Sequence, residues 1–583
     1  MIDRTPGVAA PPSAPARSGS TLDCRRSEAA PLPLCSCQHL LQGLYRTYDH
    51  WLSAAAEQSD RSPAAWRRPF LRWLDAVEGG WGVPLLLACF ALVWTAYLTV
   101  AYSGAGLHPD TLETWSFGRH FAWGYFKHPP LMGWVAGAWS RLFPPTDWSF
   151  HLMAMTNAAL ALWFVDQISR RFVTGDKRVI VLLLLMLTPV YQFHAQRFNA
   201  NSVQLATWPL ATYCFLRAYE SRTFLWAAMA GLTAAVAMLG KYYSIFLIAS
   251  FGLAAMLHPL RRAYFTSFSP WISAMVGLAA LWPHLDWLIA SDAAPIHHAL
   301  THANSDMLRS LHDSFSFVMG LAAALALSAL TWVVAAGRRI ARFPRDFVAL
   351  DDGLRLLFYV AIGTICLPVA NALIMGTDLP SLWAVQGLFL FVVLVVCGAS
   401  YGIERFYTVN MTVLAAAIAV VAVTIAAPLH ALYRNSFGYE EGRGFYRAVA
   451  FETTRQWREL VGIPLKSVVG DESLGFAVAF YSPDHPFYGL SPSIAQAAAD
   501  GPTGATQDQG WASVCFLDQV DCIEAATSLA VAAGNYVRRE FTMQSQLFGL
   551  AGLSRAAVAF FVLPKVDGLR SSHPHDSARP GSK

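Results

Sequence analysis

WGVPLLLACFALVWTAYLTVAYS, the stretch from Trp81 to Ser103, contains no charged side chain. A helix needs about 20 predominantly apolar residues to cross a bilayer, so this stretch predicts a membrane span. Runs of similar character follow along most of the chain, at 149–168, 178–195, 203–219, 224–240, 242–258, 271–290, 314–336, 354–376, 381–398 and 406–428. We therefore predict an α-helical polytopic membrane protein with about eleven transmembrane helices.

The composition agrees with a membrane protein. The chain has 583 residues, of which 55% are hydrophobic and 14% are charged, whereas soluble domains have about 25% charged residues. This balance excludes a disordered chain, a collagen-like repeat and an ordinary cytosolic enzyme. The net charge of +4 is too small for this size to predict a nucleic-acid partner. The nine cysteines include no CxxC pair, so they indicate no zinc or redox framework.

The distribution of basic residues predicts the orientation of the chain. Loops on the cytoplasmic side of a membrane carry an excess of Lys and Arg. If the N-terminus is cytoplasmic, the basic clusters all fall on the cytoplasmic side, at 61–72, 170–178, 217–222, 261–262, 338–345 and 405. The outside loops then hold only Arg119, Lys127, Arg141, Arg197, Lys241 and Arg309. We predict that the N-terminus lies inside and the C-terminal part outside.

The domain organisation follows from changes in composition. We predict a partly disordered cytoplasmic tail at 1–80, a transmembrane module at 81–428 with a first external loop at 104–148, a small C-terminal α/β extracytoplasmic domain at 429–565, and a flexible tail at 566–583. Within the external domain, 466–470, 512–517 and 557–563 predict strands, and 473–481 and 522–533 predict helices. Its cysteines, Cys515 and Cys522, form either a disulfide or two buried thiols, because spacing alone does not fix their separation.

The first external loop concentrates charge near the membrane, where charge is costly. It contains HPDTLE at 108–113 and GYFKHPP at 124–130, interleaved with aromatic residues. The pattern predicts an amphipathic helix in the headgroup region, with Asp110 and Glu113 on one side of its first turn. Pro129-Pro130 ends this segment and begins the next. By pattern alone the loop is equally consistent with an interfacial anchor whose charges are solvated.

Asp110, followed by Gly124-Tyr125-Phe126-x-His128-Pro129-Pro130-Leu131, resembles the first external loop of a known superfamily. These are the protein-mannosyltransferases and aminoarabinose transferases, membrane glycosyltransferases of the GT-C fold, glycosyltransferase family 39. Weaker matching elements follow in the family's order, at Phe198–Trp208, Gly240–Tyr242, Leu379–Trp383, Val468–Asp471 and Ala479–Pro486. The resemblance implies a GT-C-like fold in a bacterial inner membrane, with a periplasmic C-terminal domain. It implies inverting transfer of a sugar from a polyprenyl-phosphate donor to a hydroxyl of a glycolipid or other acceptor.

The resemblance also assigns roles to residues. Asp110 matches the catalytic Asp and would act as general base toward the acceptor hydroxyl. Glu113 would support it, because Thr111 stands where the family usually has Glu. Lys127 and Lys241, with Arg119 and Arg197 behind them, would stabilise the leaving phosphate; Lys241 could equally be a snorkelling interfacial lysine. The expected substrate-binding residues are His128, Tyr125, Asn201 and Tyr242, with Asn201 standing where many relatives have Asp.

No cofactor is expected, although a divalent metal is left open. The cluster of His297, His298 and His302 has no Cys and only Asp306 nearby as a further ligand, so we do not favour a zinc site there. Besides the donor and the acceptor, membrane lipids are the expected partners.

Two other functions remain possible from the sequence. One is a transporter or flippase of lipid-linked sugars, and the other is a non-catalytic membrane scaffold. A transporter should show inverted repeats and broken helices at mid-membrane. No such repeat is visible, and the ionisable residues gather at the outer surface, so we favour the transferase. The sequence names neither the sugar nor the acceptor, for which lipid A or its core is our expectation.

Overall fold

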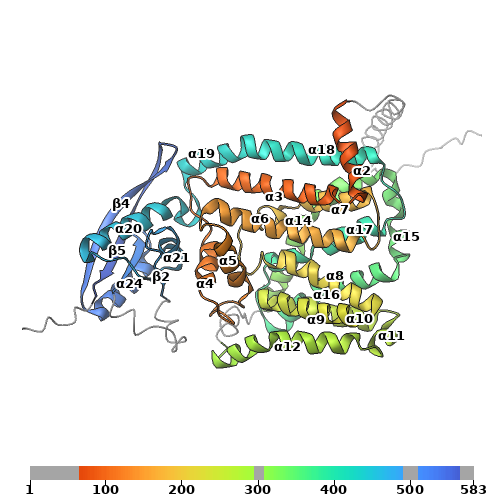
Figure 1. Ribbon diagram of the computed structural model, residues 1–583, viewed down its shortest axis with the longest axis horizontal. Coiled ribbons are helices and arrows are strands. Elements are labelled where there is room, and N and C mark those ends of the chain that lie inside the picture. The colour runs from red at the N-terminus through yellow and green to blue at the C-terminus, as the bar shows by residue number, and fades with distance from the viewer. Residues whose placement is uncertain (1–64, 294–306, 490–509, 565–583) are drawn as a thin grey trace, which may run out of the picture. The chain divides into compact units, whose positions relative to one another are not determined.

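The computed structural model describes residues 65–293, 307–489 and 510–564 (Figure 1). The chain forms two compact units, Met1–Arg68 and Pro69–Lys583, and the description below concerns the second. Three predictions lie outside the described residues. They are the disorder of the N-terminal tail before residue 65, the histidine cluster at 297–302 and the flexible tail at 566–583.

Among the described residues, six helices are long and apolar enough to cross a membrane. They are α3 (Gly82–Ala101), α6 (Asp147–Ser169), α12 (Ser269–Ala290), α16 (Asp352–Met375), the run Leu308–Val348 that contains α14 (Met307–Ala336) and α15 (Phe343–Val348), and the run Arg405–Phe437 that contains α18 (Arg405–Val421) and α19 (Ala427–Phe437).

Shorter helices fill the remaining predicted segments. They are α7 (Asp176–Met186), α8 (Gln204–Ser221), α9 (Phe224–Gly240), α10 (Ile245–Leu257) and α17 (Phe389–Gly398). Two further short helices, α2 (Arg68–Glu78) and α11 (Arg261–Phe265), are also present. Each predicted span therefore contains a helix, while the number of helices that cross the bilayer stays a prediction.

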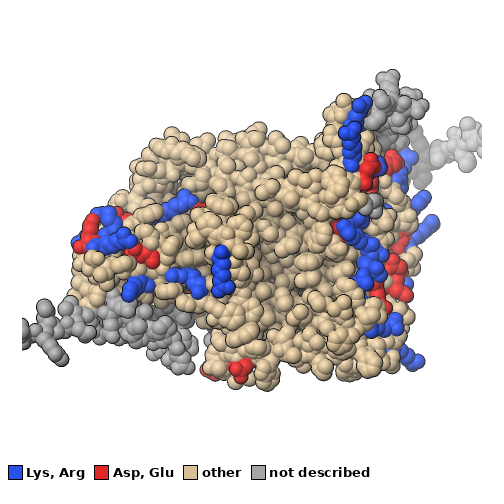
Figure 2. All heavy atoms as spheres, in the orientation of Figure 1, with Lys and Arg blue, Asp and Glu red and all other residues tan. Residues whose placement is uncertain are grey.

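The outer surface of the helices is apolar. On α12, exposed Trp271, Met275, Leu278 and Trp282 recur at helical spacing along one face. Figure 2 shows Lys, Arg, Asp and Glu gathered toward the two ends of the helices, with few over their middle. An exposed apolar face bounded by charge suits contact with lipid.

The first external loop folds into two helices that differ from the prediction. They are α4 (Pro109–Gly118) and α5 (Leu131–Leu142), and α5 begins directly after Pro129-Pro130, as predicted. The expected amphipathic helix with one face in contact with lipid is wrong for α4, because its residues 111–115 are all buried and it packs against both α5 and the external domain. Small residues allow this packing: a Cβ on Gly118 would lie 2.6 Å from the backbone nitrogen of Gly137.

The external part contains a five-stranded sheet in the order β2-β1-β3-β5-β4. The strands are β1 (Ser467–Val469), β2 (Phe487–Tyr488), β3 (Trp511–Phe516), β4 (Tyr536–Leu547) and β5 (Leu550–Val562), and the helices are α20 (Tyr446–Val461), α21 (Glu472–Tyr481) and α24 (Val520–Ala533). β1 pairs in parallel with β2 and β3, and β5 pairs antiparallel with β3 and β4. The predicted strands and helices are confirmed, and the alternating polar β4 and the helix α20 were missed.

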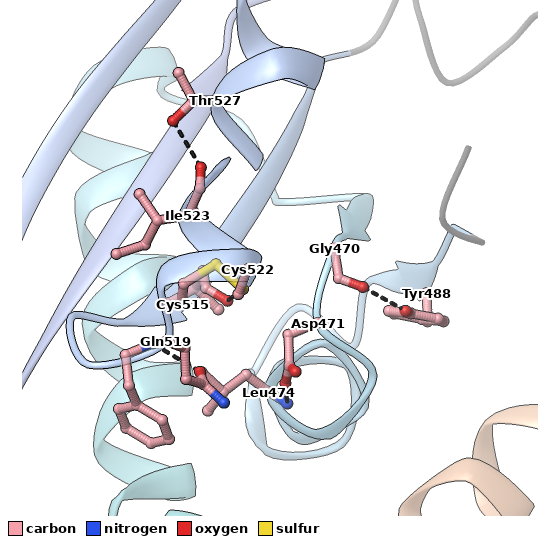
Figure 3. The surroundings of a disulfide bond; sticks show 11 residues. Gly470, Asp471, Leu474, Tyr488, Cys515, Gln519, Cys522, Ile523 and Thr527 are labelled. Carbon is pink, nitrogen blue, oxygen red and sulfur yellow. Dashed lines mark hydrogen bonds between the residues drawn. A yellow bond between two sulfur atoms is a disulfide. The ribbon is translucent and has the colours of Figure 1, made fainter. Parts of the chain in front are cut away.

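A disulfide joins two elements of this domain. Cys515 on β3 is bonded to Cys522 on α24, with the two Cα atoms 5.9 Å apart (Figure 3). The alternative of two free thiols is therefore excluded. Cys515 is fully buried beside Trp511 and Phe560, so the bond holds α24 against the apolar face of the sheet.

Long-range polar contacts fasten the external domain to the first loop. The Tyr481 hydroxyl accepts from the backbone N–H of Leu107 and donates to the Asp147 carboxylate, both at 2.7 Å. Asp147 also pairs with Arg447. The Arg443 guanidinium donates two hydrogen bonds to the carbonyl oxygen of Gly106. The loop that carries Asp110 is thus held by the external domain as well as by α5.

A buried ion pair joins α6 to α7 at the predicted cytoplasmic end. The fully buried Asp166 carboxylate accepts from Arg178 at 3.0 and 2.9 Å, and from Arg170 at 2.8 Å. Arg178 is itself buried. The charged hydrogen bonds between Asp166 and Arg178 thus tie the two helices together.

Candidate active site

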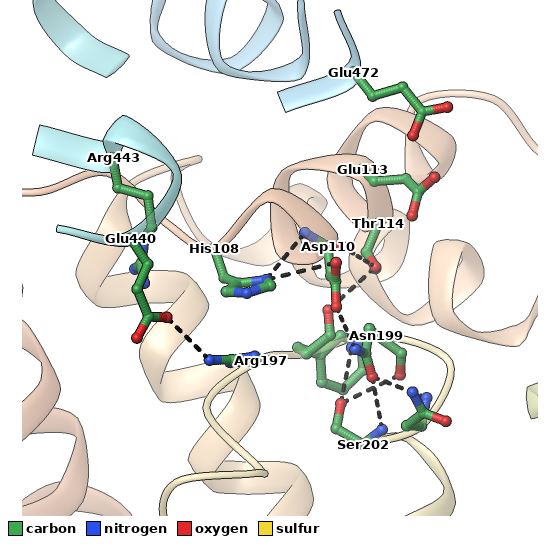
Figure 4. A network of polar contacts seen from close by, with 12 residues as sticks. His108, Asp110, Glu113, Thr114, Arg197, Asn199, Ser202, Glu440, Arg443 and Glu472 are labelled. Atoms are coloured by element: carbon green, nitrogen blue, oxygen red, sulfur yellow. Dashed lines mark hydrogen bonds and ion pairs between the residues drawn. The ribbon is translucent and has the colours of Figure 1, made fainter. Parts of the chain in front are cut away.

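Asp110 lies in the first turn of α4, where its side chain remains accessible. His108 is the N-cap of α4, and its Nδ1 accepts from the Asp110 backbone N–H at 3.3 Å. The Asp110 side chain is 43% exposed, and its Oδ2 accepts a hydrogen bond of 2.7 Å from the amide of Asn199 (Figure 4). One oxygen is thereby fixed, and Oδ1 has no comparable donor among the described residues.

Asn199 is held rigidly by its own turn. Its Oδ1 accepts from the backbone N–H groups of Asn201 and Ser202, both at 2.9 Å. The Ser202 hydroxyl in turn accepts from the Asn199 N–H at 2.8 Å. Because the amide oxygen is occupied by backbone donors, the NH₂ group must face Asp110. The turn therefore orients the carboxylate.

Lys241 is the principal cation on this side of the site. It follows the last residue of α9, and its ammonium donates to Oδ1 of Asn201 and lies 4.4 Å from the centre of the Trp383 ring. Burial lowers the pKa of Lys241 to about 7, and the nearby negative charge of Asp110 opposes that shift. Lys241 thus carries a proton that is readily lost near neutral pH, and an added anion would retain it.

Arg197 and His108 border Asp110 on the other side. Arg197 pairs with Glu440 at 3.5 Å. Burial lowers the pKa of His108 to about 4, so the ring is neutral at neutral pH and its 3.6 Å distance to Asp110 Oδ1 is not an ion pair. Glu441 has a left-handed backbone (φ 57°), and burial, with the charge of Asp110 as the next cause, raises its pKa. Both signs of charge therefore surround Asp110.

His194 adds a buried imidazole to the same region. Its Nε2 is buried and has no hydrogen-bond partner among the described residues. No sequence pattern indicated His194, because it is a single histidine between apolar segments.

Glu113 and Lys127 form a separate cluster. The Lys127 ammonium lies 3.5 Å from Glu113 and also pairs with Glu472 of the external domain. Burial raises the pKa of Glu113, whose side chain is 11% exposed, to about 7. Figure 4 shows Asp110 turned toward Asn199 and Glu113 turned in a different direction. The expected shared side is thus wrong, and Lys127 pairs with two carboxyl groups away from Asp110.

Three other predicted site residues serve the packing of the loop. Arg119 donates to the carbonyl oxygens of His485 and Pro486, at 2.8 and 2.7 Å. The Tyr125 hydroxyl donates to the His120 carbonyl oxygen at 3.1 Å, and its ring stacks on Phe117 at 4.5 Å. His128 and Tyr125 exchange two backbone hydrogen bonds, of 2.9 and 3.2 Å, which close the turn before Pro129-Pro130.

Tyr242 belongs to a hydrogen-bond chain beside Lys241. The buried His284 lies 3.0 Å from the Tyr242 hydroxyl through Nε2 and 2.6 Å from the Trp123 carbonyl oxygen through Nδ1. Because a carbonyl only accepts, Nδ1 carries the proton and Nε2 accepts from Tyr242. These hydrogen bonds link the segment that follows α9, where Lys241 and Tyr242 lie, to the first external loop.

The structure thus brings together four of the predicted residues, Asp110, Asn201, Lys241 and Arg197. It places Glu113 and Lys127 in the neighbouring cluster, and Arg119, Tyr125 and Tyr242 in contacts that position the loop. Asn199 was missed, although an Asn three residues before Ser202 is a recognisable turn signal. Across the described ranges no group of three His, Cys, Asp or Glu side chains could hold a metal ion.

Comparisons with known proteins concern the family and the fold of the chain. A family model described as dolichyl-phosphate-mannose-protein mannosyltransferase matches residues 127–287. The lipid A galacturonosyltransferase RgtD of Rhizobium johnstonii is 21% identical over 258 residues, which cover 43% of this chain and 53% of that protein. The chain therefore matches only about half the length of that relative.

Solved structures match more of the chain. ArnT from Cupriavidus metallidurans, in crystal structures bound to undecaprenyl phosphate and in the apo state, superposes with a TM-score of 0.52 at 15% identity. The match covers 82% of this chain in the first case and 83% in the second, and 98% of ArnT in both. The chain therefore has the ArnT-like GT-C fold that the sequence resemblance implied.

Proposed function

We propose that this protein is an integral-membrane glycosyltransferase that moves a sugar from a polyprenyl-phosphate donor to a hydroxyl of an envelope glycolipid. The acceptor would resemble lipid A or its core, and the reaction would occur on the periplasmic side of a bacterial inner membrane. The observation that carries the proposal is the environment of the Asp110 carboxylate. One of its oxygens is accessible, and the other accepts a hydrogen bond from Asn199. Its negative charge interacts with the ammonium of Lys241. The GT-C fold supplies the frame for this chemistry.

The reaction needs a base because an acceptor hydroxyl is a poor nucleophile. Oδ1 of Asp110 would take the hydroxyl proton while the acceptor oxygen attacks the anomeric carbon. The bond from that carbon to the phosphate oxygen breaks in the same displacement, and polyprenyl phosphate leaves with the electron pair. One displacement inverts the anomeric centre. The proton that begins on the acceptor ends on Asp110.

The leaving phosphate gains negative charge, which nearby cations stabilise. Lys241 and Arg197 are the candidates, because both interact electrostatically with the Asp110 region. Lys241 is partly buried and its pKa is lowered, so a bound phosphate would favour its charged form. Lys127 is a weaker candidate than the sequence implied, because two carboxylates already pair with it.

Two relatives guide the choice of substrates. One ArnT crystal structure contains undecaprenyl phosphate, which supports a polyprenyl-phosphate donor. RgtD is named as a lipid A galacturonosyltransferase, which supports a lipid A-like acceptor. The sugar itself is left open.

The test replaces Asp110 by Asn in the full chain. We expect the rate of sugar transfer to fall by about 10²–10⁴, the usual contribution of a general base, with unchanged expression and melting temperature. Mass spectrometry of envelope glycolipids from cells with and without the protein identifies the transferred sugar. The control is Asp518→Asn, the same change at an exposed external-domain site that pairs with Arg555, which should transfer normally.

The alternatives give different results. A flippase or a scaffold would keep its effect on envelope glycolipids after Asp110→Asn. If the variant retains full transfer, Asp110 is not the base and the proposal fails.

A further inference from the structure

The β4–β5 hairpin extends beyond the sheet to which it belongs. β3 pairs with β5 only from Ala557 to Val562, while β4 and β5 continue pairing out to Leu547 and Leu550. The distal half of the hairpin, residues 542–556, is therefore a two-stranded ribbon. Such a ribbon is marginally stable in water by itself, so it needs support from another surface.

One face of the ribbon is supported by the protein. Met543, Ser545 and Leu547 alternate along β4 and are buried. At the far end, the Asn435 amide of α19 donates to the Leu550 carbonyl oxygen at 3.4 Å. The approach there is close, since a Cβ on Gly552 would lie 2.5 Å from the Asn435 carbonyl oxygen. The end of the ribbon is thus fixed beside the last turns of α19.

With the C-terminal part of the chain outside, as the sequence predicts, the last turns of α19 lie at the outer boundary of the membrane. α19 is the outer end of the apolar run Arg405–Phe437. Near that end Tyr433 and Phe437 are exposed and lie with ring centres 4.7 Å apart. Exposed aromatic rings at the end of a membrane helix are typical of the membrane–water interface. Because Asn435 lies between these two residues, the ribbon tip lies at the same depth.

The tip itself has the composition of a membrane-contacting segment. No charged residue occurs from Phe541 to Ser554. Phe548 is 89% exposed and Leu550 is 56% exposed, and both lie at the turn, with Leu553 exposed beside them. Phe548 and Gly549 both have positive φ, of 48° and 85°, which closes the turn and projects the phenyl ring. Figure 1 shows the hairpin reaching past the end of α19.

We infer that the tip of the β4–β5 hairpin, residues 547–553, inserts into the outer-leaflet interface of the membrane and anchors the external domain there. The partner is the lipid at the boundary between headgroups and acyl chains. Lipid would cover the apolar tip that the protein leaves exposed. The inference needs only the membrane location and does not depend on the proposed activity.

The test uses the full chain in phospholipid nanodiscs, with the photoreactive residue p-benzoylphenylalanine replacing Phe548. The matched control carries the same residue at Val531, which is 58% exposed on α24, an element that contacts the sheet and not α19. We expect a covalent lipid adduct, detected by mass spectrometry, several-fold more abundant at 548 than at 531. The same probe at Leu550 provides a second reading if one variant folds poorly.

The opposite results would overturn the inference. They are equal lipid adducts at 548 and 531, no lipid adduct at either 548 or 550, or crosslinking of the tip to a second copy of the chain. The last result would show that the apolar tip is a protein interface.

Discussion

Asn199→Asp is the sharpest test of the site, because it changes one atom group in contact with the proposed base. The amide that donates to Asp110 becomes a carboxylate, while the oxygen that accepts from the backbone of residues 201 and 202 is retained. The turn should therefore keep its shape. What changes is that two carboxylates face each other and must share a proton.

The magnitude follows from the contact distance. Two unit charges 2.7 Å apart repel by about 1.5 kcal/mol in bulk water and by about 6 kcal/mol at an effective dielectric constant of about 20. Asp110 is 43% exposed, so the lower part of this range applies. A repulsion of that size raises the pKa for the last proton shared by the two carboxyl groups by about one to two units. The acid limb of the kcat/KM profile should move to higher pH by that amount.

The assay measures transfer from the identified lipid-linked donor in proteoliposomes as a function of pH. Asn201→Asp is the matched control, since the new carboxylate faces Lys241 and not Asp110. It should raise the pKa of Lys241 and move the alkaline limb upward, with the acid limb in place. If Asn199→Asp leaves the acid limb where it is in the native protein, Asp110 is not the ionising base.

Three further predictions concern other contacts. Because burial lowers the pKa of Lys241 to about 7, its ammonium is present below that pH and lost above it. The KM for the donor should therefore rise as the pH increases through neutrality. Lys241→Arg should abolish that pH dependence of KM without lowering kcat. Arg119→Ala should expose the external domain to limited proteolysis, because the guanidinium holds the carbonyls of His485 and Pro486; unchanged digestion would contradict the assigned role. Asp166→Asn should destabilise the protein, since it removes the buried carboxylate charge that accepts from Arg178 and Arg170; an unchanged melting temperature in detergent would refute this.

The sequence by itself determined the helical membrane fold and the position of the candidate base. A run such as Trp81–Ser103 predicts a helix because a bilayer leaves backbone groups no partner outside the segment, so the requirement is local and readable along the chain. Asp110 was found in the same way, from a spaced motif within one loop. The sequence contains the residues of the turn at Asn199, but it did not show that the Asn199 amide points toward Asp110.

Only the tertiary structure decided how the charged residues are used. Lys127 and Arg119 lie near Asp110 in sequence, yet one is neutralised by Glu472 and the other holds the carbonyls of residues 485 and 486. Lys241 instead joins the site from another helix, through Asn201. The free energy of a buried charge depends on which opposite charges and hydrogen-bonding groups surround it, and those come from segments hundreds of residues apart. No spacing along the chain encodes that choice.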